Sequence, residues 1–160
     1  MTQVFILRDA RPGDEALLLR FIRELAEYEK LLHEVRATEA GLGATLFGPR
    51  PFAEALVVEK AGTPVGFALW FFTVSTFNGA PSLYVEDVYV QQAHRGGGIG
   101  RAIFADLARR ALAHGCHRMD WSVLDWNEPA IRFYRSIGAQ PVLGWTVQRL
   151  TGEALAKLAA

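Results

Sequence analysis

The sequence predicts an α/β protein with a mixed central β-sheet and helices on both of its faces. Short runs rich in β-branched and aromatic residues alternate with segments whose apolar residues recur every three or four positions. Some strands follow one another through short turns, which indicates hairpins, and others are separated by helices, which indicates crossovers. No repeat, low-complexity segment or linker interrupts the 160 residues, so we expect one domain over residues 1–160.

The first half of the chain is expected to form a strand, two helices and a β-hairpin. Asp14 follows a run of turn residues and is a candidate helix N-cap. The turn Ala61-Gly62-Thr63 between two apolar runs indicates the hairpin. In chain order the predicted elements are a strand at 4–7, a helix with an apolar face over 17–32, a helix at 38–46, and strands at 55–60 and 64–74.

The second half alternates strands with helices. Gly115 and Gly138 each follow an apolar helical pattern and are expected to end the two helices. Asn127 can cap the later helix, and Pro129 is tolerated in its first turn. The predicted elements are a strand at 82–90, a helix at 99–112, a strand at 119–124, a helix at 128–137, a strand at 145–150 and a short helical tail.

The strand at 82–90 has no purely polar face. Period-two alternation places Glu86 on one face and Asp87 on the other. We therefore expect both faces to be partly covered. One face carries Leu83, Val85, Asp87 and Tyr89, and the other carries Tyr84, Glu86, Val88 and Val90.

Charge and cysteine content narrow the function classes. Basic and acidic residues number 17 each, so the chain lacks the basic surplus that a nucleic-acid binder usually carries. The single Cys116 excludes an internal disulfide framework and fits a reducing compartment. No signal peptide or long apolar run is evident, so we expect a cytoplasmic protein without membrane contact. His114 and His117 straddle a glycine turn, and no metal site is predicted.

The segment 95–101 is a glycine-rich loop between a strand and a helix. Backbone N–H groups at a helix start have no intrahelical partner and lie at the positive end of the helix dipole, so they can bind phosphate. The spacing matches neither the dinucleotide fingerprint nor a Walker A loop, because Arg101 stands where those patterns need other residues. By itself the loop fits an anion site or a plain turn.

A resemblance separates these two readings. Arg95-x-x-Gly98-x-Gly100 matches the pyrophosphate signature R/Q-x-x-G-x-G/A of the GNAT acetyltransferases, and segments 23–30, 84–90 and 125–139 match in order. Together they resemble the diamine acetyltransferase branch, which includes spermidine/spermine and thialysine acetyltransferases, over nearly the whole chain. The resemblance implies the GNAT fold, N-acetyltransferase activity, acetyl-CoA as co-substrate, and a homodimer that builds parts of the site across its interface.

The resemblance also implies which residues hold acetyl-CoA. The end of the strand at 82–90 would bind the pantetheine arm as an added strand, and the N–H of Val90 would polarise the thioester carbonyl. Asn127 would contact the coenzyme arm besides capping its helix. The implied cofactor-binding residues are Val88, Tyr89, Val90, Arg95, Gly96, Gly97, Gly98, Ile99, Gly100, Arg101, Asn127, Pro129 and Tyr134.

Acetyl transfer requires that the amine lose a proton and that the leaving thiolate gain one. We expect Glu86 to handle the amine's proton, directly or through water. The alternative is that Glu86 and Asp87 form structural ion pairs or lie on a solvated edge. The family's general acid falls on Tyr134, whose phenol can protonate sulfur. Its spacing with Phe133 and Ile137 alone favours core packing.

The acceptor is expected to be small. Polyamine-acetylating relatives carry an acidic residue and a tryptophan where this chain has Ser75 and Phe77. The resemblance is therefore nearer to the thialysine type and implies a short diamine or an amino-acid-like amine. Acetylation of a protein amine or an antibiotic-like amine stays open, as does a non-catalytic coenzyme A-binding sensor. The predicted substrate-binding residues are Tyr28, Glu29, Phe77, Glu86 and Asp87.

Overall fold

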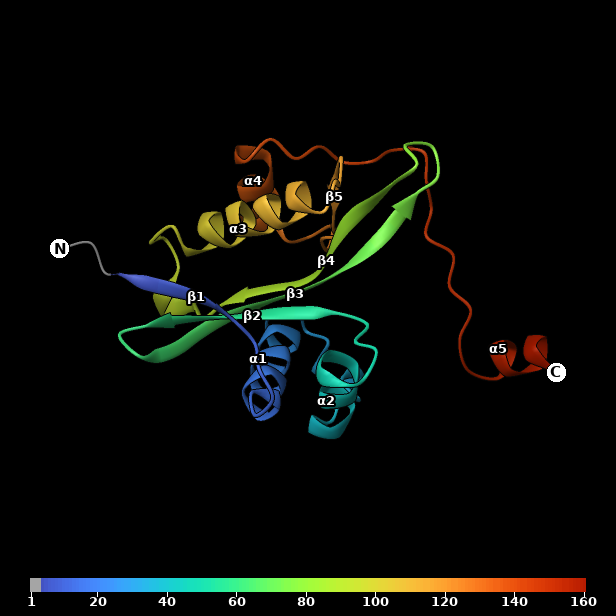
Figure 1. The fold of residues 1–160 in the computed structure, drawn as a ribbon, viewed down its shortest axis with the longest axis horizontal. Helices are drawn as coiled ribbons and strands as arrows, with labels where there is room; N and C mark the ends of the chain where they lie inside the picture. The colour runs from blue at the N-terminus through green and yellow to red at the C-terminus, as the bar shows by residue number, and fades with distance from the viewer. Residues whose placement is uncertain (1–3) are drawn as a thin grey trace. The chain divides into compact units, whose positions relative to one another are not determined.

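The computed structural model describes residues 4–160 and confirms the α/β class (Figure 1). Residues 1–3, on which the expectation about the start of the chain partly rests, lie outside this range. The described residues form one mixed sheet with strand order β1-β2-β3-β4-β5, in which β5 runs parallel to β4 and the other neighbours are antiparallel. The strands are β1 (Phe5–Asp9), β2 (Glu54–Lys60), β3 (Thr63–Ser75), β4 (Ala80–Val90) and β5 (Met119–Asp120).

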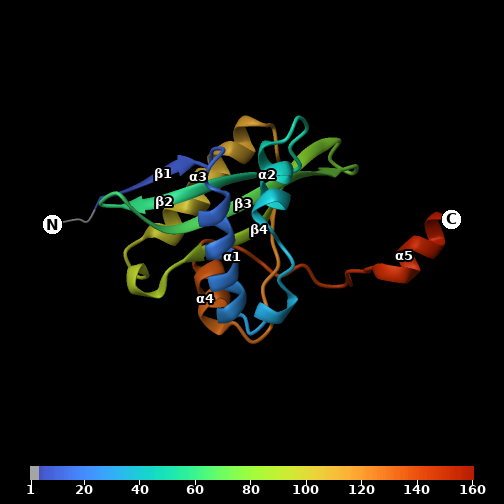
Figure 2. The same ribbon diagram turned by 90° about the horizontal axis from the view of Figure 1, so that it is seen from below.

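Helices cover both faces of the sheet, as predicted. Figure 1 shows α1 (Glu15–Tyr28) and α2 (Glu39–Phe47) on one face and α3 (Ile99–Ala113) on the other, and Figure 2 shows the same layers from below. The short 3-10 helices η1 (Leu32–Glu34) and η2 (Gln92–His94) precede α2 and α3. Helix α3 is the crossover that makes β5 parallel to β4.

Each face has its own hydrophobic core because successive side chains of a strand point to opposite faces. On the α1 face, Phe21 stacks on Phe67 with ring centroids 5.9 Å apart, beside Leu18 and Val57. On the α3 face, the core contains Leu56, Val58, Val65, Ala68, Trp70, Leu83, Val85, Val90, Ile99, Ile103 and Leu107. The central strands are therefore packed on both faces.

The predicted alternation along β4 is wrong after Val85. Leu69 pairs with Asp87 but the next residue, Trp70, pairs with Val85, so Glu86 is an extra residue in a β-bulge. Leu83 and Val85 consequently share the α3 face with Val88 and Val90. Tyr89 packs on the α1 face, and Asp87, two residues before it, lies on that same face.

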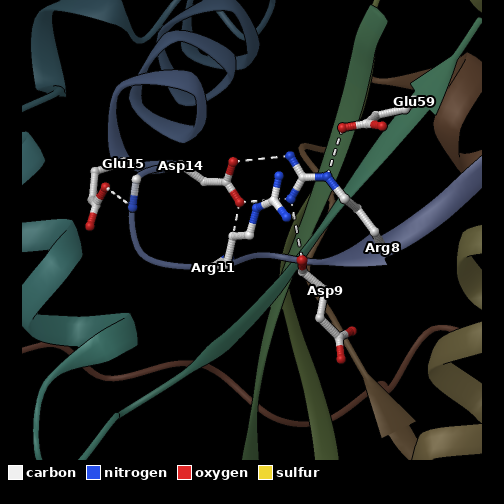
Figure 3. A network of polar contacts seen from close by, with 7 residues as sticks. Arg8, Asp9, Arg11, Asp14, Glu15 and Glu59 are labelled. Carbon is white, nitrogen blue, oxygen red and sulfur yellow. Dashed lines mark hydrogen bonds and ion pairs between the residues drawn. The ribbon is translucent and has the colours of Figure 1, made fainter. Parts of the chain in front are cut away.

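The start of α1 is fixed by an ion-pair network (Figure 3). Asp14 stands at the predicted N-cap, but its carboxylate does not cap the helix. The carboxylate accepts hydrogen bonds from both terminal guanidinium nitrogens of Arg8, at 2.7 and 3.0 Å. It also accepts one from the backbone N–H of Arg11, at 2.9 Å. Nε of Arg8 donates to Glu59 at 2.7 Å. The network joins β1, β2 and α1, and the hydrogen bonds from Arg8 lower the pKa of Asp14.

The residues after Leu124 form a separate compact unit, Asp125–Ala160. It contains α4 (Glu128–Ser136), capped as predicted by Asn127, whose side-chain oxygen accepts the Ala130 N–H at 3.4 Å, and α5 (Gly152–Ala159). The strand predicted at 145–150 is wrong, because no strand follows Asp120 among the described residues. A β-rich pattern forms a strand only where a neighbour accepts its hydrogen bonds. That residues 1–160 form one domain stays a prediction.

Candidate active site

The glycine loop has the geometry of an anion-binding helix start. Gly96 and Gly98 adopt φ values of 81° and 82°, which side chains other than glycine's disfavour. Gly98 is the N-cap of α3 without a side-chain cap, and its carbonyl accepts a hydrogen bond from the Ala102 N–H at 3.0 Å. The earlier N–H groups are therefore available to a ligand.

The residues of this loop fit the phosphate groups of coenzyme A. A Cβ built at Gly96, Gly97 or Gly98 would meet no atom within 4 Å, so the space beside the backbone is open. Backbone N–H groups at a helix start, with the positive dipole end behind them, favour an anion in that space. The predicted contacts Ile99, Gly100 and Arg101 form the first turn of α3.

The Arg95 side chain is engaged with the protein rather than with the open space beside the glycines. Its Nε donates to the Val90 carbonyl at 2.8 Å. Its guanidinium carbon lies 4.9 Å from the ring centroid of Tyr28 and 5.7 Å from that of Tyr89. These contacts join the loop, the end of β4 and the end of α1.

The end of β4 has a free edge. β4 pairs with β5 only at Leu83 and Tyr84, so within the described part of the chain no strand covers that edge of Val88, Tyr89 and Val90. An extended ligand arm can bind such an edge as an added strand does. On the other edge, Gly66 pairs with Val90, and a Cβ at Gly66 would lie 2.5 Å from the Tyr89 carbonyl oxygen. Close packing on β3 therefore fixes the strand end that leads into the loop.

Three carboxylates gather where β4 carries its bulge. Burial, followed by the charges of Glu86 and then Glu29, raises the pKa of Asp87 to about 7. Burial also raises the pKa of Glu29. A carboxyl group with a pKa near neutrality can take up and release a proton under cellular conditions. Glu86 is exposed, so Asp87 is the more buried member of the pair that the sequence predicts, and the role of either residue stays a prediction.

Tyr28 and Glu29 stand at the end of α1, as its last residue and its C-cap. Two residues that sequence reasoning missed anchor this end to β4. Gln91, the residue after β4, donates from Nε2 to the Glu24 carboxylate at 3.1 and 3.4 Å. Glu24 lies one helical turn before Tyr28, but no motif marks it, so only the fold could reveal this contact.

Phe77 is not brought together with these residues. It lies at the tip of the β3–β4 hairpin and is 97% exposed. At the rise of an extended strand, the residues from Ala80 to Asp87 already span about 23 Å. A contact of Phe77 with an acceptor bound near Asp87 of the same chain would need a different arrangement of the hairpin.

The remaining predicted residues lie in the second unit. Asn127 is the N-cap of α4, Pro129 is in its first turn, and Tyr134 is in its last turn. The Tyr134 ring lies 5.6 Å from the Phe133 ring, centroid to centroid. Their roles toward the coenzyme stay predictions. Among the described residues, no group of three or more His, Cys, Asp or Glu side chains could hold a metal ion, and no helix is both long and apolar enough to cross a membrane.

Comparison with known proteins identifies the family. The model of the acetyltransferase (GNAT) family matches residues 19–139. The chain is 42% identical to a thialysine N-epsilon-acetyltransferase of Bos taurus, with 96% of each chain covered. It is 29% identical to an L-ornithine N5-acetyltransferase of Arabidopsis thaliana, covering 93% of this chain and 85% of that one.

A solved structure agrees. An integron cassette protein from the mobile metagenome of V. cholerae superimposes with a TM-score of 0.80 at 26% identity, and the match covers 99% of this chain and 98% of that one. The strand–glycine–helix loop and the open edge of β4 are thus found in a chain whose sequence matches an acetyltransferase model over most of its length. The chain belongs to the GNAT acetyltransferase family.

Proposed function

We propose that the chain transfers the acetyl group of acetyl-CoA to the terminal primary amine of a small amino-acid-like molecule or short diamine. The observation that carries this proposal is the acidic cluster formed by Glu86 and Asp87, on the strand that leads into the glycine loop, with Glu29 at the end of α1. A primary amine is a cation at neutral pH, so it is attracted to such a cluster. Two relatives are named for acetyl transfer to thialysine and to ornithine, and these names support the same substrate class.

In the proposed reaction, acetyl-CoA supplies an activated thioester carbonyl. The N–H groups of the loop hold its phosphates, and the free edge of β4 aligns its arm so that the Val90 N–H polarises the carbonyl. Asp87 or Glu86 takes the proton from the bound ammonium, directly or through water, and the free amine attacks the carbonyl carbon. The nitrogen gives up its second proton as the amide forms, the carbon–sulfur bond breaks, and the thiolate takes up a proton.

For the last proton we propose Tyr134 as the donor, a role that rests on the family resemblance. The substitution Tyr134→Phe removes the hydroxyl and keeps the ring. We expect kcat to fall by about 10²–10⁴ with little change in acetyl-CoA affinity. A variant with full kcat and a lower Tm would instead make Tyr134 a packing residue.

We further propose a cytoplasmic homodimer in which Phe77 of one copy helps to build the acceptor site of the other. The exposed position of Phe77, far along the strand from Asp87, supports this arrangement. Sedimentation at micromolar concentration tests the dimer. A monomer that retains full activity would contradict it.

A panel of acceptors tests the reaction. The protein is incubated with acetyl-CoA and thialysine, ornithine, lysine, spermidine, spermine, an aminoglycoside or a peptide with a free N-terminus, and products are identified by mass spectrometry. We expect the largest kcat/KM for the amino-acid-like amines. A preference for the peptide or the aminoglycoside would establish one alternative acceptor. Coenzyme A binding without any acetylated product would establish the sensor.

A further inference from the structure

Arg95 is the residue that links the glycine loop to the helix carrying the acceptor carboxylate Glu29. It comes directly after η2 and directly before Gly96. Its hydrogen bond to the Val90 carbonyl, 2.8 Å long, holds the guanidinium over the rings of Tyr28 and Tyr89. A guanidinium is planar, so one hydrogen bond and two ring faces together define its orientation.

A second contact repeats the link one helical turn earlier. Glu24 accepts a hydrogen bond from Gln91, while Tyr28, four residues later on the same face of α1, contacts Arg95. The segment from Tyr89 to Arg95 therefore holds the last turn of α1 at two points. A shift of this segment moves the end of the helix as well.

The end of α1 in turn sets the charge around Asp87. Glu29, the C-cap of α1, is close enough for its charge to act on Asp87. The backbone around it is constrained, because the Leu31 N–H bonds to the Ala26 carbonyl at 2.7 Å and Lys30 adopts a positive φ of 61°. Tyr28 and Glu29 are thus adjacent parts of one rigid helix end.

We propose that Arg95 is a positioning residue that couples occupancy of the glycine loop to binding of the acceptor amine, by holding Tyr28 and with it Glu29 in register with Asp87. The part about the amine rests on the proposed function. Binding of a coenzyme phosphate orders the loop, and the bridge through Arg95 then orders the acceptor side of α1. By linkage, the amine strengthens coenzyme binding by the same factor.

Kinetics of two variants and their combination test the coupling. Arg95→Lys keeps the charge but loses the planar fork, and Tyr28→Leu removes the ring. We expect each to raise the amine KM about tenfold while the coenzyme A Kd, measured by calorimetry, changes less than threefold. The double variant should be no worse than either single variant, because both break one bridge. Additive losses, or a coenzyme A Kd raised tenfold by Arg95→Lys alone, would overturn the proposal.

Arg110→Lys is the matched control. Arg110 lies on α3 with its guanidinium carbon 4.9 Å from the Trp70 ring centroid, so it makes the same type of contact on another element, and its ion pairs are with Asp9 and Asp106. We expect wild-type KM values for both substrates. An amine KM raised as much by Arg110→Lys would show that loss of any cation–ring contact in the fold has this effect, and would overturn the specific role of Arg95.

Amide hydrogen exchange gives a readout that needs no acetylation. Adding coenzyme A to the wild-type protein should slow exchange of the amides at 26–31 at least threefold, and in Arg95→Lys it should leave them unchanged. No slowing in the wild-type protein, with coenzyme A bound, would refute the coupling even where an amine is acetylated. Slowing that depends on Arg95 in a protein that acetylates no amine would sustain the coupling and refute the proposed function.

Discussion

The two ends of α1 carry their charges in opposite ways. At its start, the Arg8 guanidinium lies against the Asp14 and Glu59 carboxylates, and the pKa of Asp14 is lowered. At its far end, Glu29 and Asp87 lie near a third carboxylate, and the pKa of Asp87 is raised to about 7. Opposite charges stabilise the first region in the free protein, whereas like charges destabilise the second.

The first region is held together by its own ion pairs, and the second gathers like charges that a bound cation would offset. Ion pairs with matched geometry hold three elements together without a ligand. Like charges gathered at a partly buried place raise the free energy of the folded chain, and a cation bound there lowers it. Substitutions at the start of α1 should therefore change stability and leave catalysis intact, while those at its end should do the reverse.

The largest effect is expected from Asp87→Asn. This variant keeps the shape of the side chain and removes its titration, so kcat/KM for the amine should fall by about 10²–10⁴ while Tm stays equal or rises. Glu86→Gln in parallel shows which carboxylate handles the proton, and the exposed Glu34→Gln is the control. Full activity of both Asp87→Asn and Glu86→Gln would show that the carboxylates near the end of α1 have no role in catalysis, and the contrast with its start would be lost.

Arg8→Met should have the opposite profile. It leaves the partly buried Asp14 carboxylate without its main partner, at a cost of about 1–3 kcal/mol in the free energy of unfolding. Urea unfolding measures this loss. The kcat and both KM values should stay within twofold of wild type in conditions where the variant is folded. A loss of activity in the folded variant would mean that the network also serves the site.

The smallest expected effect is on the pH dependence of the unfolding free energy, where Asp14 and Asp87 contribute with opposite signs. Because the pKa of Asp14 is lowered on folding, its contribution is present above its unfolded pKa and is lost as the pH falls below about 4. Because the pKa of Asp87 is raised on folding, its destabilising contribution grows as the pH rises from about 4 to 7 and is complete above that.

Unfolding free energies of Asp14→Asn and Asp87→Asn, each compared with wild type across this range, measure the two contributions. As the pH is lowered, the advantage of wild type over Asp14→Asn should shrink. Over the same titration, the disadvantage of wild type relative to Asp87→Asn should also shrink. If wild type were more stable than both variants, or less stable than both, the proposed contrast between the two ends of α1 would be contradicted.

Features whose conformation depends on a few adjacent residues were predicted from the sequence. The glycine loop, the Asn127 cap and the turn at Gly62 each depend on backbone conformations that a few adjacent residues specify, and they lie where predicted. The backbone conformation at the start of α3 follows from the same residues. The family motifs also picked out Tyr28, Glu29 and Asp87, although their mutual position came only with the fold.

Features that depend on a distant partner escaped prediction. The bulge at Glu86 requires the register of β3, and its one trace in the sequence is that the apolar Val85 and Val88 stand three apart in a strand. The short β5 and the absent strand at 145–150 show that β-rich patterns do not specify pairing. The stacking of Arg95 on Tyr28 joins residues far apart in the chain, and no spacing rule connects them.

The close approach at Gly66 limits how this enzyme could be engineered for heat resistance. Replacing a strand glycine by alanine is an ordinary route to a more stable protein, because it restricts the unfolded chain. At Gly66 the added methyl would meet the Tyr89 carbonyl and push Val90 away from β3. A thermostability library should therefore leave this position unchanged, since any gain in melting temperature there would come with a displacement of the strand end that leads into the glycine loop.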